Sequence, residues 1–455
     1  MFKIIKKIAT SALLAGAASL FYSQSALALL PIEHWTQASG AQVWLVQSPA
    51  IPMVDVQVDF DAGSRRDPPA QAGLASAAAL MSAKGVRASG GDAALDENQL
   101  GEAWADLGAS LEASAGRDAL SFSLRSLTQA DLLERAVRLA ARQIGEPSDP
   151  EDVWQRERAR WQAAIAEADT KPGTVAGKAF ARAVYGDNPY GLQTTAGTLD
   201  AIGVSDLRAW HARYLQRCRA RVAIVGAVDR AQAQTLVDEL LSHLPVNDQG
   251  NCATLPALPP MQPLAQAREI DIPFSSAQAH VLIGQPGFVR SDPDFLALLV
   301  GNHILGGGGF TSRLMEQVRE KRGLSYSVFS QFSPGLSAGA FIAGLETRPD
   351  QTAEAVKVTR EVIADFVRNG PTETELRAAK DNLIGGFALR IDSNRKLLAN
   401  VVNIARNGLP LDYLDHWTDR VQALTVADVK AAIGRKLQPD RMVTVVVGAT
   451  PAAKP

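Results

Sequence analysis

The feature that most constrains this fold is a long internal repeat. Residues 204–215 read VSDLRAWHARYL and are followed from residue 221 by RVAIVGA. A similar passage returns 222 positions later, as VADVKAAIGRKL from residue 426 and VTVVVGA from residue 443. Each copy is typical of a capped helix followed by a buried apolar strand that ends in Gly-Ala. Two copies at so long a period predict two homologous halves, because a solenoid would need several short repeats.

A proline-rich stretch marks the boundary between the halves. Residues 245–263 contain five prolines with Asn, Asp, Gln and Gly between them, which is typical of an extended linker. We therefore expect a first half over residues 29–248, a linker over 249–267 and a second half over 268–455. A chain of 455 residues is also too long for a single hydrophobic core.

Within each half the side-chain pattern alternates between strands and helices. Residues 54–60 and 120–125 alternate apolar with polar side chains, as in strands that are buried on one face. Residues 131–144 and 350–369 have apolar side chains at helical spacing, and residues 372–375 (TETE) form a capping box that opens another helix. This pattern predicts an α+β fold in which helices cover a mainly antiparallel sheet in each half.

The first 28 residues read as a signal peptide. Three lysines lie at positions 3, 6 and 7, an apolar stretch spans residues 8–21, and residues 26–28 (ALA) form a small-x-small cleavage site. Cleavage would begin the mature chain at Leu29, and the short, Ala-rich signal indicates a bacterial periplasm. The alternative is an uncleaved N-terminal anchor, although the apolar stretch is shorter than the ~20 residues that a membrane-spanning helix needs.

Charge and cysteine content exclude some classes of function. The formal net charge is −2 and becomes −5 without the three signal-peptide lysines, so nothing favours nucleic acid or an anionic membrane surface as a partner. The two cysteines, Cys218 and Cys252, are too few for a disulfide framework. Export would permit a bridge between them, and two buried thiols are the alternative.

A second constraint lies in residues 73–85, which read GLASAAALMSAKG. This segment resembles the zinc-binding helix of the insulinase/pitrilysin family of metallopeptidases, where the same frame carries H-x-x-E-H. There the two histidines bind zinc from one helix face, and the glutamate acts as general base. In this sequence the histidines would fall at Ser76 and Leu80, and the glutamate at Ala79. Serine is a poor zinc ligand and the other two side chains cannot bind zinc, so the resemblance implies a vacant zinc site.

The family's third zinc ligand is missing as well. It is a glutamate on a later helix, seven residues after another acidic residue, and the matching segment 157–167 reads ERARWQAAIAE. Glu157 keeps the acidic position, but Ala164 stands where the ligand would be, with Glu167 as the nearest carboxylate. No two of the six histidines lie within five residues of each other, so we expect this chain to bind no metal. A Ser-His-Asp triad stays open, although no G-x-S-x-G motif occurs.

Further motifs extend the resemblance over nearly the whole chain after the signal peptide. They are AGSR at 62–65, YGDNPYG at 185–191 and GTLDAI at 197–202. Their order and spacing are similar to those of the bacterial and mitochondrial-processing-peptidase branch of the family. The resemblance implies that the two halves enclose a clam-like chamber.

The second half keeps a motif that the family uses at its active site. Residues 318–328 read VREKRGLSYSV, and the family's Arg and Tyr, seven residues apart, fall on Arg319 and Tyr326. The resemblance implies that this pair reaches the substrate backbone and the reacting carbonyl, since a guanidinium donates forked hydrogen bonds and a tyrosine hydroxyl stabilises an oxyanion. The alternative is an ordinary solvated helix face. We expect a helix through Arg319 that stops at Gly323, and a strand that starts at Tyr326.

Four consecutive glycines at 306–309 precede that motif. No Gly-Lys-Ser/Thr follows them, which excludes a phosphate-binding loop. They predict a tight turn and a close approach between backbone segments.

Together these motifs predict a non-catalytic, substrate-binding subunit of a heterodimeric periplasmic zinc peptidase. A homologous partner with H-x-x-E-H would hold the zinc, while this chain would supply Arg319 and Tyr326 and would be inactive alone. A peptide would add to a sheet edge in the partner, with residues 110–114 here as a vestigial or secondary edge. The alternative is a structural or peptide-binding pseudopeptidase without a protease partner. An active peptidase with an unusual site would need catalytic groups that the sequence does not offer.

Overall fold

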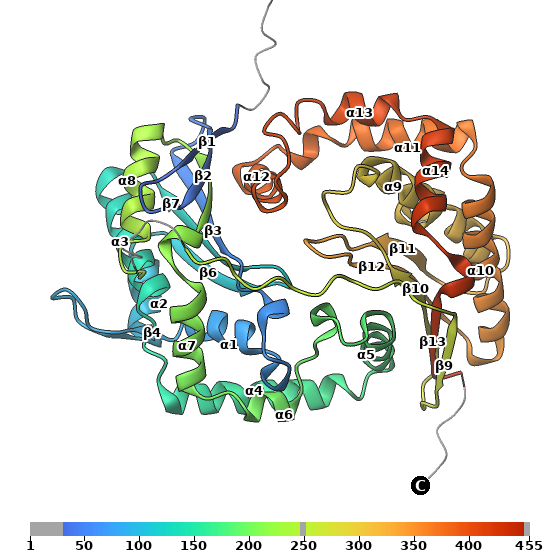
Figure 1. Cartoon of the computed structure of the whole chain (residues 1–455), viewed down its shortest axis with the longest axis horizontal. Helices are drawn as coiled ribbons and strands as arrows, with labels where there is room; N and C mark the ends of the chain where they lie inside the picture. Colours follow the sequence, from blue (N-terminus) through green and yellow to red (C-terminus); the bar gives the residue numbers. More distant parts are fainter. Residues whose placement is uncertain (1–30, 246–251, 450–455) are drawn as a thin grey trace, which may run out of the picture.

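The computed structural model describes residues 31–245 and 252–449. The signal peptide expected over residues 1–28 lies outside these ranges, as do the first residues of the expected linker. The described chain forms two α+β halves that lie opposite each other (Figure 1).

The first half contains a six-stranded sheet of order β1-β2-β8-β3-β7-β6. β2 and β8 run parallel, and the other neighbouring pairs run antiparallel. The strands of this sheet are β1 (Glu33–Thr36), β2 (Gln42–Gln47), β3 (Met53–Phe60), β6 (Ser110–Ala115), β7 (Leu120–Leu127) and β8 (Arg221–Gly226), and a small separate hairpin is formed by β4 (Gly85–Val86) and β5 (Leu95–Asp96).

Helices cover the outer face of this sheet. Alternate β3 side chains, from Val54 to Phe60, join a core with residues of α1, α3 and α8. The helices in the first part of the chain are α1 (Leu74–Met81), α2 (Glu97–Asp106), α3 (Ala130–Gly145), α4 (Glu151–Ala168), α5 (Pro172–Tyr185), α6 (Ala196–Asp200), α7 (Val204–Tyr214) and α8 (Arg230–Leu240). The expected strands near 54 and 120 and the expected helix over 131–144 are confirmed as β3, β7 and α3.

The second half repeats this plan with a five-stranded sheet of order β11-β12-β10-β13-β9, in which β13 and β9 run parallel. Its strands are β9 (Arg268–Ile272), β10 (Ala279–Pro286), β11 (Val328–Phe332), β12 (Ala340–Thr347) and β13 (Val443–Val447). Its helices are α9 (Phe295–Asn302), α10 (Thr352–Asn369), α11 (Glu373–Gly385), α12 (Asn394–Asn407), α13 (Trp417–Ala423) and α14 (Val426–Lys436).

The internal repeat is therefore a repeat of structure. α7 and β8 recur 222 residues later as α14 and β13, and α5 recurs at the same displacement as α12. The strand order β2-β8-β3-β7-β6 matches β9-β13-β10-β12-β11. The expected capping box is present too, because the Thr372 hydroxyl accepts from the Glu375 N–H while the Glu375 carboxylate accepts from the Thr372 N–H. The expectation of two homologous halves with mainly antiparallel sheets is confirmed.

The halves exchange one helix each, which the sequence did not indicate. α5 belongs to the first half by sequence but packs on β10 and β13 of the second sheet, where Phe180 joins a core with Val443 and Val445. α12 belongs to the second half but packs on β3 and β8 of the first sheet. Figure 1 shows α12 beside the first sheet and α5 beside the second. Each sheet is therefore covered on its inner face by a helix from the other half.

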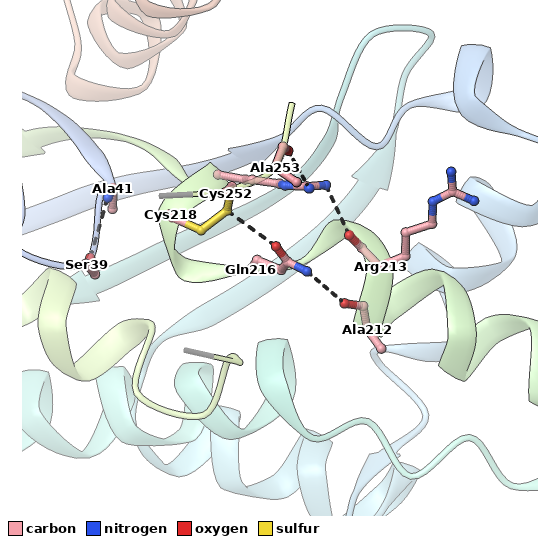
Figure 2. Close-up of a disulfide and its surroundings, with 9 residues drawn as sticks. Ser39, Ala41, Ala212, Arg213, Gln216, Cys218, Cys252 and Ala253 are labelled. Atoms are coloured by element: carbon pink, nitrogen blue, oxygen red, sulfur yellow. Dashed lines mark hydrogen bonds between the residues drawn. A yellow bond between two sulfur atoms is a disulfide. The ribbon is translucent and has the colours of Figure 1, made fainter. Parts of the chain in front are cut away.

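The segment between the halves is extended over residues 252–267, without helix or strand. Cys218 and Cys252 form a disulfide with their Cα atoms 5.7 Å apart, which resolves the alternative that the sequence left open (Figure 2). Beyond the disulfide, backbone carbonyls of the segment accept hydrogen bonds from first-half side chains: Ala253 from Arg219 (2.9 Å), Pro256 from Arg66 (2.5 Å) and Pro259 from Asn188 (3.1 Å). The disulfide and these hydrogen bonds thus hold the segment against the first half before it reaches β9.

Candidate functional site

The helix that matches the family's zinc helix is intact as a helix. α1 is rich in alanine, the best helix former, and begins after Gly73, whose φ of 111° suits glycine. The buried carboxylate of Asp67 accepts hydrogen bonds from the Gly73 N–H (2.8 Å) and the Ala75 N–H (3.0 Å). Burial raises the pKa of Asp67 to about 6, against the opposing effect of these hydrogen bonds. The scaffold of the site is therefore held in place without its zinc ligands.

The residues at the ligand positions do not fit a zinc ion. Ser76 and Leu80 are half-buried on α1, Ala79 is buried, and Ala164 is exposed on α4. Together they offer one neutral hydroxyl, whereas zinc takes imidazole, thiolate or carboxylate ligands. Over residues 31–245 and 252–449, no three His, Cys, Asp or Glu side chains gather in a way that could hold a metal ion.

Glu157, which keeps the family's acidic position on α4, serves an ion-pair network. Its carboxylate lies 3.0 Å from both Arg156 and Arg160 and 3.6 Å from Lys84, the residue that follows α1 by three positions. Burial alone would raise the pKa of Glu157, but the Arg156 hydrogen bond and the charges of Lys84 and Arg160 hold that pKa below its ordinary value. The other carboxylate that sequence reasoning considered, Glu167, is exposed and pairs with Lys171 at 3.0 Å.

Among the described residues, the histidines do not form a Ser-His-Asp triad, the catalytic site that the sequence left open as an alternative to zinc. In the described part of the chain, no histidine ring is hydrogen-bonded to a serine hydroxyl. Four rings contact a carboxylate or a backbone carbonyl instead: His211, His243, His280 and His416. The Ser-His-Asp arrangement that the sequence left open thus has no matching geometry here.

The Arg/Tyr motif of the second half lies on irregular backbone. Arg319 is in a π-helical segment (Met315–Glu320). This geometry is rare in proteins overall, but where it occurs it is often at a functional site. The chain turns at Gly323, whose φ is 61°. The strand β11 starts at Val328, so the expected start at Tyr326 was wrong by two residues. The Ser325 hydroxyl, which has one proton to donate, lies 2.6 Å from the Ser327 carbonyl oxygen and 2.7 Å from that of Glu346. These contacts hold residues 325–327 outside the ladder.

Two aromatic rings hold the Arg319 side chain. Its guanidinium carbon lies 4.8 Å from the ring centroid of Phe310 and 4.9 Å from that of Tyr326. Phe310 is 66% exposed and Tyr326 is 81% exposed. At exposed sites such cation–π contacts contribute about 0.5–1 kcal/mol each. Sequence reasoning did not single out Phe310, and its only signal was an aromatic residue directly after the glycine run.

The glycine run forms the tight turn and the close backbone approach that the sequence predicted, and it places Phe310 directly after them. A Cβ atom on Gly306 would lie 2.4 Å from the Ser330 backbone nitrogen of β11, and Gly309 has a φ of 63°. Both positions therefore require glycine. The run brings Phe310 onto the same surface as Arg319.

Arg319 differs from the neighbouring basic residues in having no polar partner. Arg313 donates to both oxygens of Glu375, at 2.6 and 2.8 Å, and Arg322 donates to Gln317. Lys321 pairs with Glu316 at 2.7 Å. Arg319 has no hydrogen bond or ion pair from its guanidinium to any described residue. Its donors are therefore free for a ligand, whereas those of Arg313, Lys321 and Arg322 are engaged.

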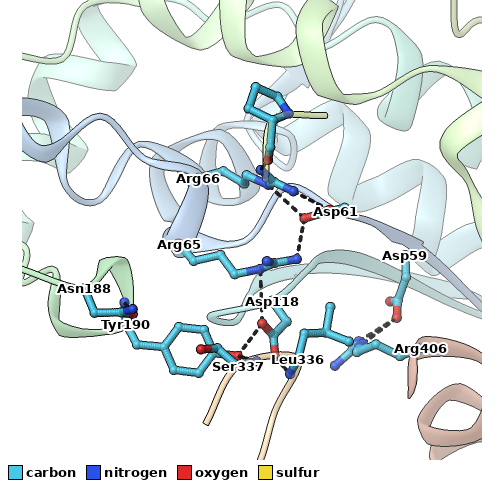
Figure 3. Close-up of polar contacts among 11 residues, drawn as sticks. Asp59, Asp61, Arg65, Arg66, Asp118, Asn188, Tyr190, Leu336, Ser337 and Arg406 are labelled. Atoms are coloured by element: carbon cyan, nitrogen blue, oxygen red, sulfur yellow. Dashed lines mark hydrogen bonds and ion pairs between the residues drawn. The ribbon is translucent and has the colours of Figure 1, made fainter. Parts of the chain in front are cut away.

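The two halves meet at a polar node beside the edge strand β6 (Figure 3). Asp118, in the β6–β7 turn, pairs with Arg65 (3.1 Å) and accepts hydrogen bonds from the Tyr190 hydroxyl (2.5 Å) and the Leu336 N–H (3.0 Å). Burial, together with the Asp118 contact, raises the pKa of Tyr190. Leu336 lies in the β11–β12 turn, so this node joins the turns of the two facing sheets.

Comparison with known proteins agrees with this architecture. Residues 42–198 match the domain described as insulinase (peptidase family M16), and residues 201–383 match the domain described as peptidase M16 inactive domain. A solved M16 inactive-domain structure from Pseudomonas fluorescens is 33% identical, with a TM-score of 0.86, and the match covers 93% of this chain and 99% of that one. The chain belongs to the insulinase family of peptidases. Within that family it lacks the H-x-x-E-H residues.

More distant insulinase-family proteins show the same fold or related sequences. An uncharacterized zinc protease of Streptomyces coelicolor is 29% identical over 276 residues, and the match spans 59% of each chain. The non-peptidase homolog YmxG of Helicobacter pylori is 23% identical over 75% of this chain and 82% of its own length. The periplasmic protease PqqL of Escherichia coli shares the fold with a TM-score of 0.78 at 18% identity, over 93% of this chain and 46% of PqqL.

Proposed function

We propose that this insulinase-family chain is a non-catalytic, substrate-binding subunit of a heterodimeric periplasmic zinc peptidase. The observation that carries the proposal is the contrast between its two sites. The positions of the zinc ligands hold no suitable donor, whereas Arg319 is kept beside Tyr326 with its guanidinium free. A chain with that pair but without zinc ligands is suited to complete a site whose metal lies elsewhere.

The division of labour follows from the chemistry of each part. A homologous partner carrying H-x-x-E-H and the third glutamate would hold the zinc, which activates water and polarises the scissile carbonyl. Arg319 would donate hydrogen bonds to the substrate, and the Tyr326 hydroxyl would donate to the oxyanion that develops on the carbonyl. This chain alone would hydrolyse nothing. The name non-peptidase homolog, given to the related Helicobacter pylori protein, is compatible with such a role.

A periplasmic location is part of the proposal. Its main support is the signal-peptide pattern of residues 1–28, and the fold is shared with a periplasmic protease of Escherichia coli. Among the described helices, none combines the length and the apolar character that crossing a bilayer requires. We also propose the domain boundaries 29–248 and 268–455, on either side of the linker 249–267.

The first test is whether a zinc-binding homologue accompanies the chain. The mature chain would be tagged and purified from its native periplasm, and the co-purifying proteins would be identified by mass spectrometry. We expect near-stoichiometric recovery of a homologue with H-x-x-E-H. Recovery of this chain alone, as monomer or homodimer, would contradict the heterodimer and leave a binding or scaffolding protein.

The second test assigns the roles of Arg319 and Tyr326 in the reconstituted pair. Arg319→Ala and Tyr326→Phe should each lower kcat/KM for peptide hydrolysis by about 10- to 1,000-fold, as for the loss of a donor to the transition state. Size-exclusion chromatography should show the pair still assembled. Arg322→Ala is the matched control, because Arg322 bonds within its own segment. Unchanged turnover in both variants would exclude the assigned roles.

A further inference from the structure

The surface around Arg319 exposes two aromatic side chains. Phe310 and Tyr326 are 66% and 81% exposed, and both are among the most exposed large hydrophobic residues of the described chain. Exposed aromatic residues that gather on one surface are typical of binding sites. Here both rings contact the same guanidinium, so the three side chains form one unit, which we call the aromatic–arginine site.

The geometry of this site leaves the donors of Arg319 available. A guanidinium is planar, and its N–H groups lie in that plane around its edge. Contact between its face and aromatic rings restrains the side chain without using those donors. Phe310 is therefore a positioning residue, and it is held by the glycine run whose tight approach to β11 was described above.

The charge around the site limits what it can bind. Arg313 and Lys321 are paired with carboxylates and Arg322 donates to the neutral Gln317, so Arg319 is the basic residue here whose donors stay free. A single planar fork matches a carboxylate, which accepts two parallel hydrogen bonds and carries one negative charge.

We propose that the aromatic–arginine site of Phe310, Arg319 and Tyr326 binds a peptide carboxylate, and that Phe310 sets the orientation of Arg319 for it. The carboxylate is either the C-terminus of the peptide or an Asp or Glu side chain, which offer the same chemistry. This inference rests on the proposed function only in taking a peptide as the ligand. It names the group of the peptide to which Arg319 donates, so that the chain selects peptides by charge.

The test uses the mature chain alone, without partner or zinc, so that it is independent of catalysis. Three fluorescein-labelled decapeptides of one neutral sequence would be compared by fluorescence anisotropy: a free C-terminal carboxylate, a C-terminal amide, and an amide with one internal Glu. We expect at least one carboxylate peptide to bind about tenfold or more tightly than the neutral amide, as for a charge-assisted hydrogen bond. The preferred peptide identifies the source of the carboxylate.

Variants connect this preference to the site. Arg319→Ala should abolish the discrimination between carboxylate and amide, whereas the matched control Arg322→Ala should keep it. Phe310→Ala should weaken carboxylate binding about two- to fivefold, the loss expected for one exposed cation–π contact, and Phe310→Tyr should restore it. Circular dichroism would establish that each variant is folded.

Equal affinity for the three peptides, no measurable binding of either carboxylate peptide, or discrimination that survives Arg319→Ala would each overturn the inference. These outcomes are separate from failure of the proposed function. A missing zinc-binding partner would refute the heterodimer and leave carboxylate binding measurable. An Arg319-dependent pair without carboxylate preference would refute only the carboxylate site.

Discussion

Asp67 shows how a single residue maintains a site that has lost its chemistry. Its carboxylate accepts hydrogen bonds from N–H groups at the start of α1, so the helix keeps its start although Ser76, Ala79 and Leu80 stand where the family has the zinc-binding histidines and the general-base glutamate. The cost of burial appears in its pKa of about 6, more than two units above that of a free aspartate. Arg319 is the opposite case, a charge that is kept free of partners.

The raised pKa of Asp67 predicts a pH-dependent stability. Because the folded state holds this proton more tightly than the unfolded state, the contribution is complete below pH 3.8 and is lost as the pH rises through 6. Asp67→Asn removes this titration. The free energy of unfolding of the variant, relative to the wild type, should therefore increase by about 2–3 kcal/mol between pH 4 and pH 7. Urea denaturation at several pH values measures this difference, and a difference independent of pH would contradict the burial argument.

At the scale of elements, the same plan is built twice and then used differently. The strand order recurs in the second half, and the α7–β8 unit recurs there as α14 and β13. The second half also has irregular backbone around Arg319 and along the glycine run. The segment that joins the halves is itself an element, since the Cys218–Cys252 disulfide and three carbonyl contacts fix it along the first half.

The disulfide should contribute measurably to stability. It closes a loop with a sequence separation of 34 residues, for which the chain-entropy relation gives about 4 kcal/mol. Cys218→Ala/Cys252→Ala should lower the free energy of unfolding by an amount of that order and should make the linker more sensitive to limited proteolysis. Wild-type protein under reducing conditions is the control and should behave in the same way. Unchanged stability in both cases would show that the carbonyl contacts hold the segment without the bridge.

At the scale of the whole molecule, the two halves are tied together at several places. α5 and α12 are exchanged between the sheets, and Arg406 of α12 donates to the buried Asp59 of β3 at 2.5 and 3.0 Å (Figure 3). The node at Asp118 joins the turns of the two sheets. These contacts join the two halves by helix packing, an ion pair and hydrogen bonds between turns.

Gly335 tests how much the node at Asp118 contributes. A Cβ atom on Gly335 would lie 2.5 Å from an Asp118 carboxylate oxygen and 2.6 Å from the Tyr190 hydroxyl. Gly335→Ala should therefore force the turns apart and destabilise the protein by about 1–3 kcal/mol, as overpacking does. The control is Gly434→Ala in α14, where a Cβ atom has no neighbour within 4 Å, and it should be neutral or stabilising by up to about 1 kcal/mol. Thermal and urea unfolding compare the two, and a neutral Gly335→Ala would show that the node is loose.

Local patterns explain which predictions succeeded. The alternation of residues 54–60, the helical spacing of 131–144 and the capping box at Thr372 depend on neighbouring residues, and each gave the element that was expected. The start of the strand after Arg319 was placed two residues early, because the contact of the Ser325 hydroxyl with the carbonyl of Glu346, 21 residues away, helps to decide where the ladder begins. The roles of Arg319 and Tyr326 stay predictions.

The sequence by itself determined the duplication, the family and the loss of the zinc ligands, because these depend on the order and identity of residues along the chain. Only the tertiary structure decided that Cys218 and Cys252 pair, that α5 and α12 cross between the halves, and that Phe310 packs on Arg319. It also decided which charges are free, since Arg313 and Arg319 are the same residue type in one helical region and only their surroundings differ. Contacts between segments distant in sequence are set by packing of the whole chain, and local propensity does not contain them.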